Sequence, residues 1–263
     1  MQPPSARGGS AVGATVGGSI GSGAMAGVPM LSNQQIQFFR TFGYLKLPGL
    51  FAADIEAITD AFEAVFANQS IYRVESGDVE VHRFQDRTTI PWFIDQHPTL
   101  AALRDDPRTV GVVRSLLGDD FEYSESDGNL FSCETEWHCD IYGSPLRIPH
   151  IKLSFYLDRL TAETGAPRVM PGTHHWTEGY AVDLRGKFDN NVGSLPEVFG
   201  VDGPALPCVA LETEPGDLLA WYYRTIHASY NGGPDRRLFT VNFRAPAPDR
   251  VPDRQAQRAG APG

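Results

Sequence analysis

The sequence of 263 residues contains few cysteines, few lysines and no long apolar run. Its cysteines, Cys133, Cys139 and Cys208, are odd in number and lack C-x-x-C spacing. This argues against a disulfide framework and a structural zinc knuckle, and it favours a reducing, cytoplasmic setting. No apolar run approaches the roughly 20 residues that span a bilayer. Because no basic region precedes a Leu-rich segment, we expect neither a membrane partner nor a signal peptide.

Positive charge is also scarce, with 22 Lys and Arg against 32 Asp and Glu and a net charge of -10. Binding nucleic-acid phosphates requires a basic face, so we expect no nucleic-acid partner. Only Lys46, Lys152 and Lys187 are lysines, and this arginine bias is typical of a GC-rich bacterial gene. A small-molecule substrate, free or carrier-bound, is compatible with this charge, and the oligomeric state stays open.

The two ends differ in composition from the rest of the chain. Residues 1–30 are rich in Gly, Ala and Ser, lack aromatic residues and are predicted to be disordered, because they bury too little surface to offset ordering entropy. Residues 247–263 are rich in Pro and Arg and are predicted to form a flexible tail. The single folded domain is therefore expected at 31–246, a length that one core can serve.

Helical patterns come first in this domain. Ser32 is a candidate N-cap and Gly43 a candidate stop for a first helix. Further helices are predicted over 52–68, 98–106 and 107–118, and a short strand over 44–48. From Phe121 onward, alternating runs such as "IKLSFYL", "DLLAWYY" and "LFTVNFR" predict strands. The fold class is therefore α+β, an antiparallel barrel or jelly roll preceded by N-terminal helices.

The stretch "EWHCDIYG" places His138 and Asp140 two residues apart. On a strand both side chains lie on one face, whereas Cys139 lies on the other and is more typical of a strand filler than of a nucleophile. An imidazole and a carboxylate on one face supply two ligands of a 2-His-1-carboxylate site. H-x-D alone is a weak signal, and polar residues on an ordinary strand explain it equally well.

A second segment, "WYYRTIHASYNGGPDRRLFTVNFR", supplies His227 and then Arg236 at the start of the next strand. A third metal ligand with an arginine nearby matches what an oxygenase using 2-oxoglutarate requires, because the far carboxylate of this keto acid is bound well by a guanidinium.

Several motifs together resemble the phytanoyl-CoA dioxygenase family of Fe(II)/2-oxoglutarate oxygenases, over about residues 31–244. They are "LSNQQIQFFRTFGYLKLPGLF", "WHCD", "LSFYLDRLTAETGAPRVMPGTH" and "GDLLAWYYRTIHAS". The resemblance implies a double-stranded β-helix (a cupin-like jelly roll). It implies iron ligands at His138, Asp140 and His227, with Arg236 binding the C5 carboxylate of 2-oxoglutarate and Ser229 assisting. A polar residue before H-x-D often contacts the co-substrate in this family, and Asn129 and Thr135 are candidates, although Asn129 in "DGN" is also typical of a turn.

Arg237 competes with Arg236 for the co-substrate. Strand parity groups Arg236 with Leu238 and Thr240, and Arg237 with the apolar Phe239 and Val241. We expect the more apolar face to lie under the helices, which favours Arg236.

Other polar residues have a more ordinary explanation. Lys152 lies on the polar face of its strand, where an exposed lysine is more common than one that reaches an anion. His174 and His175 are adjacent, so an extended chain would turn them apart and a structural role is favoured over metal binding. His82 and Arg83 lie in a segment expected to be irregular, where pocket and solvent roles are equally plausible. Aromatic residues that either line a pocket or belong to the core are Trp92, Phe93, Tyr142 and Tyr223.

The resemblance implies an enzyme that uses Fe(II), 2-oxoglutarate and O₂, supported by ascorbate, to hydroxylate an unactivated C–H of a small molecule with release of succinate and CO₂. A role in specialised metabolism is plausible by analogy. Asp140 disfavours halogenation, because related halogenases lack this carboxylate, whereas desaturation and cyclisation stay open. Two further alternatives are a metal- or ligand-binding barrel without turnover and a zinc hydrolase, the latter leaving Arg236 unexplained.

Overall fold

The computed structural model describes residues 31–67, 72–74, 77–79, 82–84, 87–131, 134–140, 148–175, 179–189 and 195–246. The segments predicted to be disordered (1–30) and flexible (247–263) lie outside the described residues, as do Cys133, Tyr142 and the side chains of His82 and Arg83.

The first helix, α1 (Asn33–Phe42), has the ends that the sequence predicts. The Gln35 amide donates to Oγ of Ser32, and the Ser32 amide donates to the Gln35 side chain, at 3.2 and 2.9 Å. The helix ends at Gly43, whose φ of 83° is a left-handed conformation that glycine adopts without steric cost. Strand β1 (Tyr44–Leu47) follows directly, so this reciprocal capping and the glycine stop fix where the chain enters the sheet.

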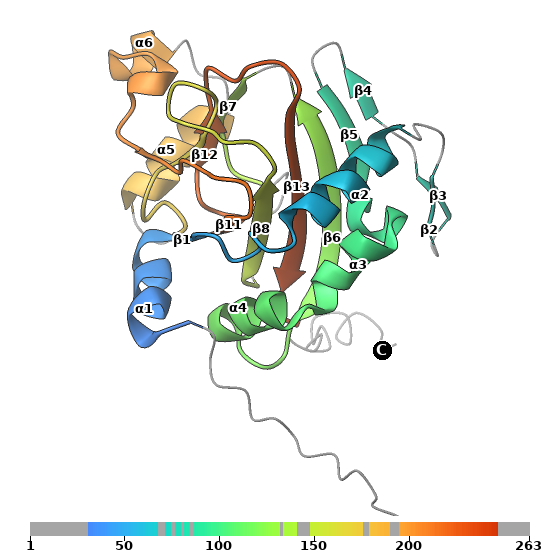
Figure 1. Cartoon of the computed structure of the whole chain (residues 1–263). Helices are drawn as coiled ribbons and strands as arrows, with labels where there is room; N and C mark the ends of the chain where they lie inside the picture. The colour runs from blue at the N-terminus through green and yellow to red at the C-terminus, as the bar shows by residue number, and fades with distance from the viewer. Residues whose placement is uncertain are drawn as a thin grey trace, which may run out of the picture.

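Three further helices precede the main strands, as predicted. They are α2 (Ile55–Ala67), α3 (Pro98–Asp105) and α4 (Pro107–Leu117), with a short 3₁₀ helix η1 (Phe93–Gln96) before α3. Figure 1 shows α2, α3 and α4 lying across one face of the large sheet.

The large sheet is antiparallel and has the order β1-β11-β8-β13-β6-β5-β4. Its remaining strands are β11 (Leu218–Tyr222), β8 (His150–Tyr156), β13 (Arg236–Arg244), β6 (Glu122–Phe131), β5 (Arg87–Pro91) and β4 (His82–Phe84).

A smaller antiparallel sheet has the order β10-β9-β12-β7. Its strands are β10 (Val209–Ala210), β9 (Pro167–Val169), β12 (His227–Ser229) and β7 (Thr135–His138). The remaining elements are the hairpin β2 (Tyr72–Val74) and β3 (Gly77–Val79), α5 (Gly179–Asp189), α6 (Leu195–Phe199) and η2 (Gly203–Ala205). The chain is thus helical first and then β-rich, which confirms the α+β class. The two sheets share no strand pair among the described residues, so the barrel is not closed there.

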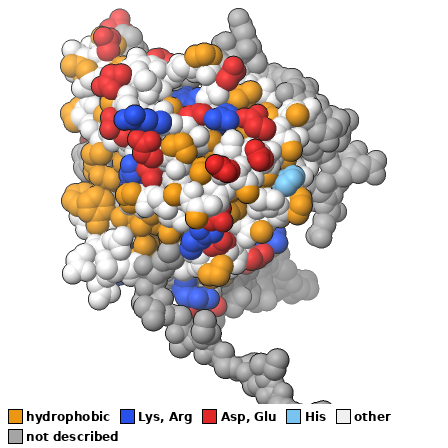
Figure 2. Space-filling model, in the orientation of Figure 1, with side chains coloured by type: hydrophobic (Ala, Val, Ile, Leu, Met, Phe, Trp, Pro, Cys, Tyr) orange, Lys and Arg blue, Asp and Glu red, His pale blue; other side chains and the backbone are white. Residues whose placement is uncertain are grey.

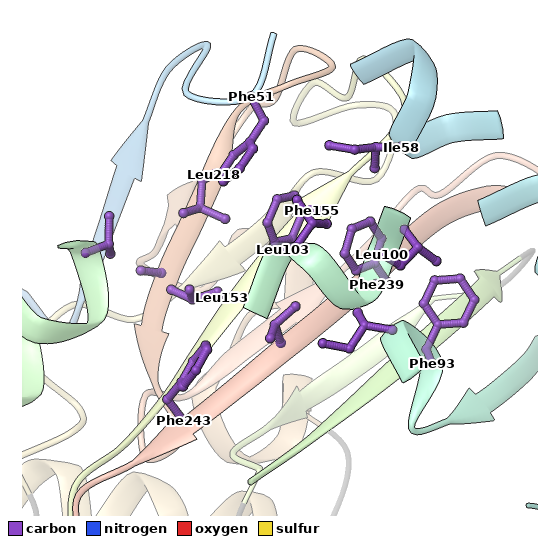
Figure 3. Packing of buried hydrophobic residues seen from close by; sticks show 14 of the residues in the cluster. Phe51, Ile58, Phe93, Leu100, Leu103, Leu153, Phe155, Leu218, Phe239 and Phe243 are labelled. Atoms are coloured by element: carbon purple, nitrogen blue, oxygen red, sulfur yellow. The ribbon is translucent and has the colours of Figure 1, made fainter. Parts of the chain in front are cut away.

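The core lies between the helices and the large sheet. Figure 3 shows Phe155 and Phe239 packed against Leu100 and Phe93, with the two phenyl rings of β8 and β13 stacked at 4.6 Å between centroids. Phe239 alternates along β13 with Leu238, which belongs to a different buried cluster. The opposite face of the large sheet carries this second cluster, and four of its residues also line a pocket: Phe131, Tyr156, Trp221 and Leu238.

Two local predictions were wrong, and two helices were not predicted. The segment before α3 was expected to be irregular, yet β4 and β5 extend the large sheet there. "DGN" was compatible with a turn, yet it lies inside β6, where a Cβ on Gly128 would lie 2.1 Å from the Phe93 ring. Helices α5 and α6 interrupt the β-rich half without having been predicted. Tertiary packing, which local patterns do not report, decided each case.

Charges on the surface are mixed. On the face shown in Figure 2, Lys and Arg side chains lie among Asp and Glu side chains. Ion pairs account for part of this mixture, such as Arg108 with Asp54 at 2.6 Å. Among the described residues, no helix is both long and apolar enough to cross a membrane.

Candidate functional site

Strands β7 and β12 bring His138 and His227 together. The two residues are directly paired in the small sheet, and their ring centroids lie 4.3 Å apart. Asp140 follows β7, and its amide donates to the carbonyl of Tyr223 at 3.0 Å. Oδ1 of Asp140 lies 4.0 Å from Nε2 of His138, and Oδ2 lies 3.7 Å from Nε2 of His227. Side chains that lie 89 residues apart in sequence therefore converge on one point.

Backbone carbonyls set the tautomers of both imidazoles. Nδ1 of His138 lies 2.7 Å from the carbonyl of Glu136, and Nδ1 of His227 lies 2.9 Å from that of Thr225. Since a carbonyl only accepts, each Nδ1 carries the proton, and in the neutral ring Nε2 keeps its lone pair. Burial lowers the pKa of His227 to about 3, so this imidazole is neutral at pH 7. Both Nε2 atoms are thus ready to bind a cation.

Lys152 holds the third member of the group. Its ammonium on β8 donates to Oδ1 of Asp140 at 2.9 Å, and the two side chains are only 13% and 8% exposed. Burial acts to raise the pKa of Asp140, but the charge of Lys152, together with electrostatic interaction with the two imidazoles, outweighs it and lowers the pKa to about 2. The carboxylate is therefore ionised, and its Oδ2 is buried without a hydrogen-bond partner.

These three residues fit a divalent metal ion. One ligand atom from each lies within 4.8 Å of the others, the only such His, Cys, Asp and Glu cluster among the described residues. Two imidazole nitrogens and one carboxylate oxygen are the donors of sites that bind ferrous iron and leave positions open. Oδ2 of Asp140 is buried and has no hydrogen-bond partner, which indicates that a cation binds between the three residues.

Arg236 and Ser229 form a second polar group nearby. Arg236 is 4% exposed, and its Nη1 donates to Oγ of Ser229 and, at 2.6 Å, to the carbonyl of Gly165. The backbone at Gly165 and Gly232 approaches the guanidinium of Arg236 closely. A Cβ on Gly165 would lie 2.7 Å from Nη1, and one on Gly232 would lie 3.0 Å from Cζ. A buried guanidinium held in this way is suited to a carboxylate ligand.

Arg237 lies on the opposite face of β13. Its Nη2 donates to Oδ1 of Asp158 at 2.6 Å, and its Nη1 donates to Oε1 of Glu63 on α2 at 2.8 Å. These carboxylates raise the pKa of Arg237 and keep its side chain outside the pocket. Of the two arginines, Arg236 is the one that faces the histidines.

One pocket of about 370 Å³ joins both groups. Every residue singled out from the sequence as a metal or co-substrate ligand lines it: Asn129, Thr135, His138, Asp140, His227, Ser229 and Arg236. Asn129 is held by its neighbours, since its Oδ1 accepts from Thr89 and its Nδ2 donates to Asp127, at 2.8 and 2.9 Å.

A sequence match that covers most of the chain identifies its family. The sequence profile described as Phytanoyl-CoA dioxygenase (PhyH) matches residues 39–238. The chain belongs to this family. No curated protein sequence matches it significantly.

Solved structures share the family fold at low sequence identity. The non-heme alpha ketoglutarate dependent carbocyclase SnoK from nogalamycin biosynthesis has 23% identity and a TM-score of 0.61, over 87% of this chain and 90% of that one. HygX from Streptomyces hygroscopicus with nickel and 2-oxoglutarate bound has 19% identity and a TM-score of 0.62, over 82% and 88%. EctD from S. alaskensis with bound Fe has 21% identity and a TM-score of 0.61, over 82% and 77%.

In this member of the family, His174 and His175 lie away from the pocket. They belong to a turn, so the expectation that their rings face apart was wrong, and the ring centroids lie 3.9 Å apart. Nε2 of His174 donates to the carbonyl of Arg40 at 3.0 Å, and Nε2 of His175 donates to that of Thr41 at 3.2 Å. Both rings therefore cap the last carbonyls of α1.

Sequence reasoning misjudged or missed several lining residues. Lys152 was interpreted as an exposed strand lysine, whereas it is buried against Asp140. Trp221 was not singled out, yet it lines the pocket with its ring 5.4 Å from that of His227. The alternating polar run of β6 was also overlooked, although it brings Glu125 and Asp127 to the pocket wall. Of the aromatic candidates, Tyr223 lines the pocket, Phe93 is core and Trp92 is 36% exposed.

Proposed function

We propose that this protein is a non-haem Fe(II)- and 2-oxoglutarate-dependent oxygenase that hydroxylates an unactivated C–H of a small molecule. The observation that carries the proposal is the shared pocket of about 370 Å³. A His–Asp–His group lies at one place in it, and a buried arginine paired with a serine lies at another. This pairing matches a metal-chelating keto acid whose far end is a carboxylate.

The residues have distinct roles in this proposal. His138, Asp140 and His227 hold the metal, and the carbonyls of Glu136 and Thr225 keep both Nε2 atoms directed at it. When bound, the metal with 2-oxoglutarate and O₂ supplies the oxidising power, with release of succinate and CO₂.

Arg236 and Ser229 bind the C5 carboxylate of 2-oxoglutarate. The guanidinium is buried, and its hydrogen bonds to Ser229 and Gly165 fix its direction. Asn129 and Thr135 line the same pocket and complete the polar wall on the co-substrate side.

The family and the site also support proposals about the barrel fold, the reaction outcome and the metabolic role. The two antiparallel sheets with the pocket on their inner faces are the halves expected of a double-stranded β-helix, formed by the domain over 31–246. Asp140 occupies the position that a halide would need, which favours hydroxylation over halogenation, with desaturation or cyclisation as the alternative outcome. A role in specialised metabolism is supported by analogy with SnoK and with HygX, whose structure has been determined with hygromycin B bound. The cytoplasmic setting and the absence of a nucleic-acid partner stay predictions.

Succinate formation tests the proposal. Purified protein with Fe(II), 2-oxoglutarate, ascorbate and O₂ is expected to form succinate slowly without substrate. His138→Ala, Asp140→Ala and His227→Ala should each abolish this while keeping a cooperative unfolding transition. The matched control is His175→Ala, a histidine outside the pocket, which should retain the rate. If metal binds but no succinate forms under any condition, the alternative of a binding barrel without turnover replaces this proposal.

A further inference from the structure

The pocket holds two carboxylates that neither the metal nor the co-substrate explains. Asp127 and Glu125 lie two residues apart on β6, on the face that lines the pocket. Neither forms an ion pair with a described Lys or Arg. The basic lining residues are engaged elsewhere, with Lys152 on Asp140 and Arg236 on Ser229 and Gly165. Within the described part of the chain, neither carboxylate therefore has an ion-pair partner.

Asp127 is oriented rather than mobile. Its Oδ2 accepts from Nδ2 of Asn129 at 2.9 Å and from Oγ1 of Thr240 at 3.0 Å. Both bonds reach the same oxygen, and no described group donates to Oδ1. A carboxylate fixed through one oxygen while the other is left for a ligand is a common arrangement for binding a donor.

Ser154 is an independent sign that a ligand lies beside Asp127. Register places Asp127, Thr240 and Ser154 in one row across β6, β13 and β8. Ser154 is completely buried and lines the pocket, yet its hydroxyl has no hydrogen-bond partner. A buried hydroxyl without a partner costs free energy, so it indicates a polar group that enters the pocket at this row.

Glu125 extends the negative wall to the rim of the pocket. Its side chain is exposed, and its Oε1 accepts from the hydroxyl of Tyr223 at 2.6 Å. The neighbouring row places Glu125 opposite Asn242, which is in turn opposite Lys152. Glu125 and Lys152, the partner of Asp140, thus lie in one row, with β13 between their strands.

The charges and the geometry of the pocket then indicate the class of ligand. In the proposed function the metal and Arg236 offset the two negative charges of 2-oxoglutarate, so the class of the further ligand depends on the geometry at Asp127, where Oδ1 receives no donor from the described residues. Arg87 also lines the pocket. In the strand register it lies opposite Phe131, which is four residues, or roughly 13 Å, along β6 from Asp127. The donor to Oδ1 of Asp127 is therefore expected to arrive with the substrate.

We propose that Asp127, assisted by Glu125, binds a protonated nitrogen of the substrate, so that this enzyme acts on a small amine, amidine or guanidine. This inference rests on the proposed function and names the substrate class of the same pocket. A volume of about 370 Å³ that also holds the co-substrate limits the part of the substrate inside to a few carbons around that nitrogen.

Matched small probes test this inference. Butylamine, butylguanidine and the neutral 1-butanol are titrated into the protein loaded with Zn(II) and 2-oxoglutarate, with binding followed by ligand-observed NMR. The cationic probes should bind about ten-fold or more tightly than 1-butanol, as expected for a charged hydrogen bond. Asp127→Asn should reduce this preference to about two-fold, and Glu125→Gln should reduce it less, because its carboxylate is exposed.

Controls separate this inference from the proposed function. Asp105→Asn removes a 75% exposed carboxylate on α3 and should leave the cation preference unchanged. Asp127→Asn should keep a cooperative unfolding transition, which shows that the variant is folded. Equal binding of butylamine and 1-butanol to the unmodified protein, or a preference that survives both variants, overturns the inference. If succinate forms in that case, the oxygenase function stands. If the cation preference holds but no succinate forms, the binding site stands and the oxygenase function falls.

Discussion

The ammonium of Lys152 lies 2.9 Å from Oδ1 of Asp140, and both side chains line the pocket. This ion pair leaves the other oxygen, Oδ2, on the side of His227 at 3.7 Å from its Nε2. Lys152 thereby neutralises the carboxylate before a metal ion arrives and presents one oxygen to the ion.

Replacing Lys152 should therefore affect the metal-free protein most. In Lys152→Met the buried carboxylate loses its partner, and we expect the free energy of unfolding to fall by about 3 kcal/mol with a chelator present. With Zn(II) bound the loss should be smaller, because the ion supplies the compensating charge. Urea unfolding in both conditions measures the difference.

Lys46→Met is the matched control for this prediction. Its ammonium lies 2.9 Å from Asp217, which does not line the pocket, so its effect should be independent of metal. A Lys152→Met loss of the same size with and without Zn(II) would show that Lys152 does not act through the metal site.

Substitutions of the two adjacent arginines, Arg236 and Arg237, should have different effects on 2-oxoglutarate binding. Arg236→Ala removes the buried guanidinium and should weaken 2-oxoglutarate binding by roughly 100-fold, the value of a charged bidentate contact. Arg237→Ala removes partly exposed ion pairs to Asp158 and Glu63, and should change this affinity by less than about two-fold while costing up to about 1 kcal/mol of stability. Calorimetric titration of 2-oxoglutarate with Zn(II) present decides between them. The reverse result would move the co-substrate to Arg237.

Two neighbouring glycines provide a finer test of the arginine. A Cβ at residue 232 would lie 3.0 Å from Cζ of Arg236, whereas one at residue 233 would meet nothing within 4 Å. Gly232→Ala should displace the guanidinium and weaken 2-oxoglutarate binding by about five- to ten-fold. Gly233→Ala should bind like the unmodified protein. Similar affinities for both variants would mean that close approach to Gly232 does not position the arginine.

Acid should destabilise the fold through His174. Burial lowers the pKa of His174 to about 4, whereas a histidine in an unfolded chain titrates near 6.5. As the pH falls, the unfolded chain takes up this proton first, so the stability is complete above about pH 6.5 and decreases toward pH 4.

The expected size of this loss is about 1–3 kcal/mol. His174→Gln lacks the titrating ring, so its free energy of unfolding should change less between about pH 7.5 and about pH 5. Chemical unfolding at both pH values measures this. An equal decrease in both proteins would assign the acid sensitivity to other groups.

Local sequence patterns were sufficient to predict the ends of α1 and the faces on which the side chains of the main strands lie. Ser32 and Gly43 bound α1 because capping depends on residues within one turn of the helix end. Parity along β13 separated the apolar Phe239 from Arg236 because side chains alternate on any strand. The same alternation predicted His138 and Asp140 as a candidate pair, although β7 ends at His138 and Asp140 lies just beyond it.

Only the tertiary structure decided which residues meet across strands. The contact of Lys152 with Asp140, the row of Asp127, Thr240 and Ser154, and the position of Gly128 under Phe93 all depend on strand register and sheet order. A single sequence does not specify register, because a strand of a given pattern has several possible partners. The sequence by itself therefore determined the proposed metal ligands and the family resemblance, whereas packing of the two sheets decided the charge balance of the pocket that surrounds them.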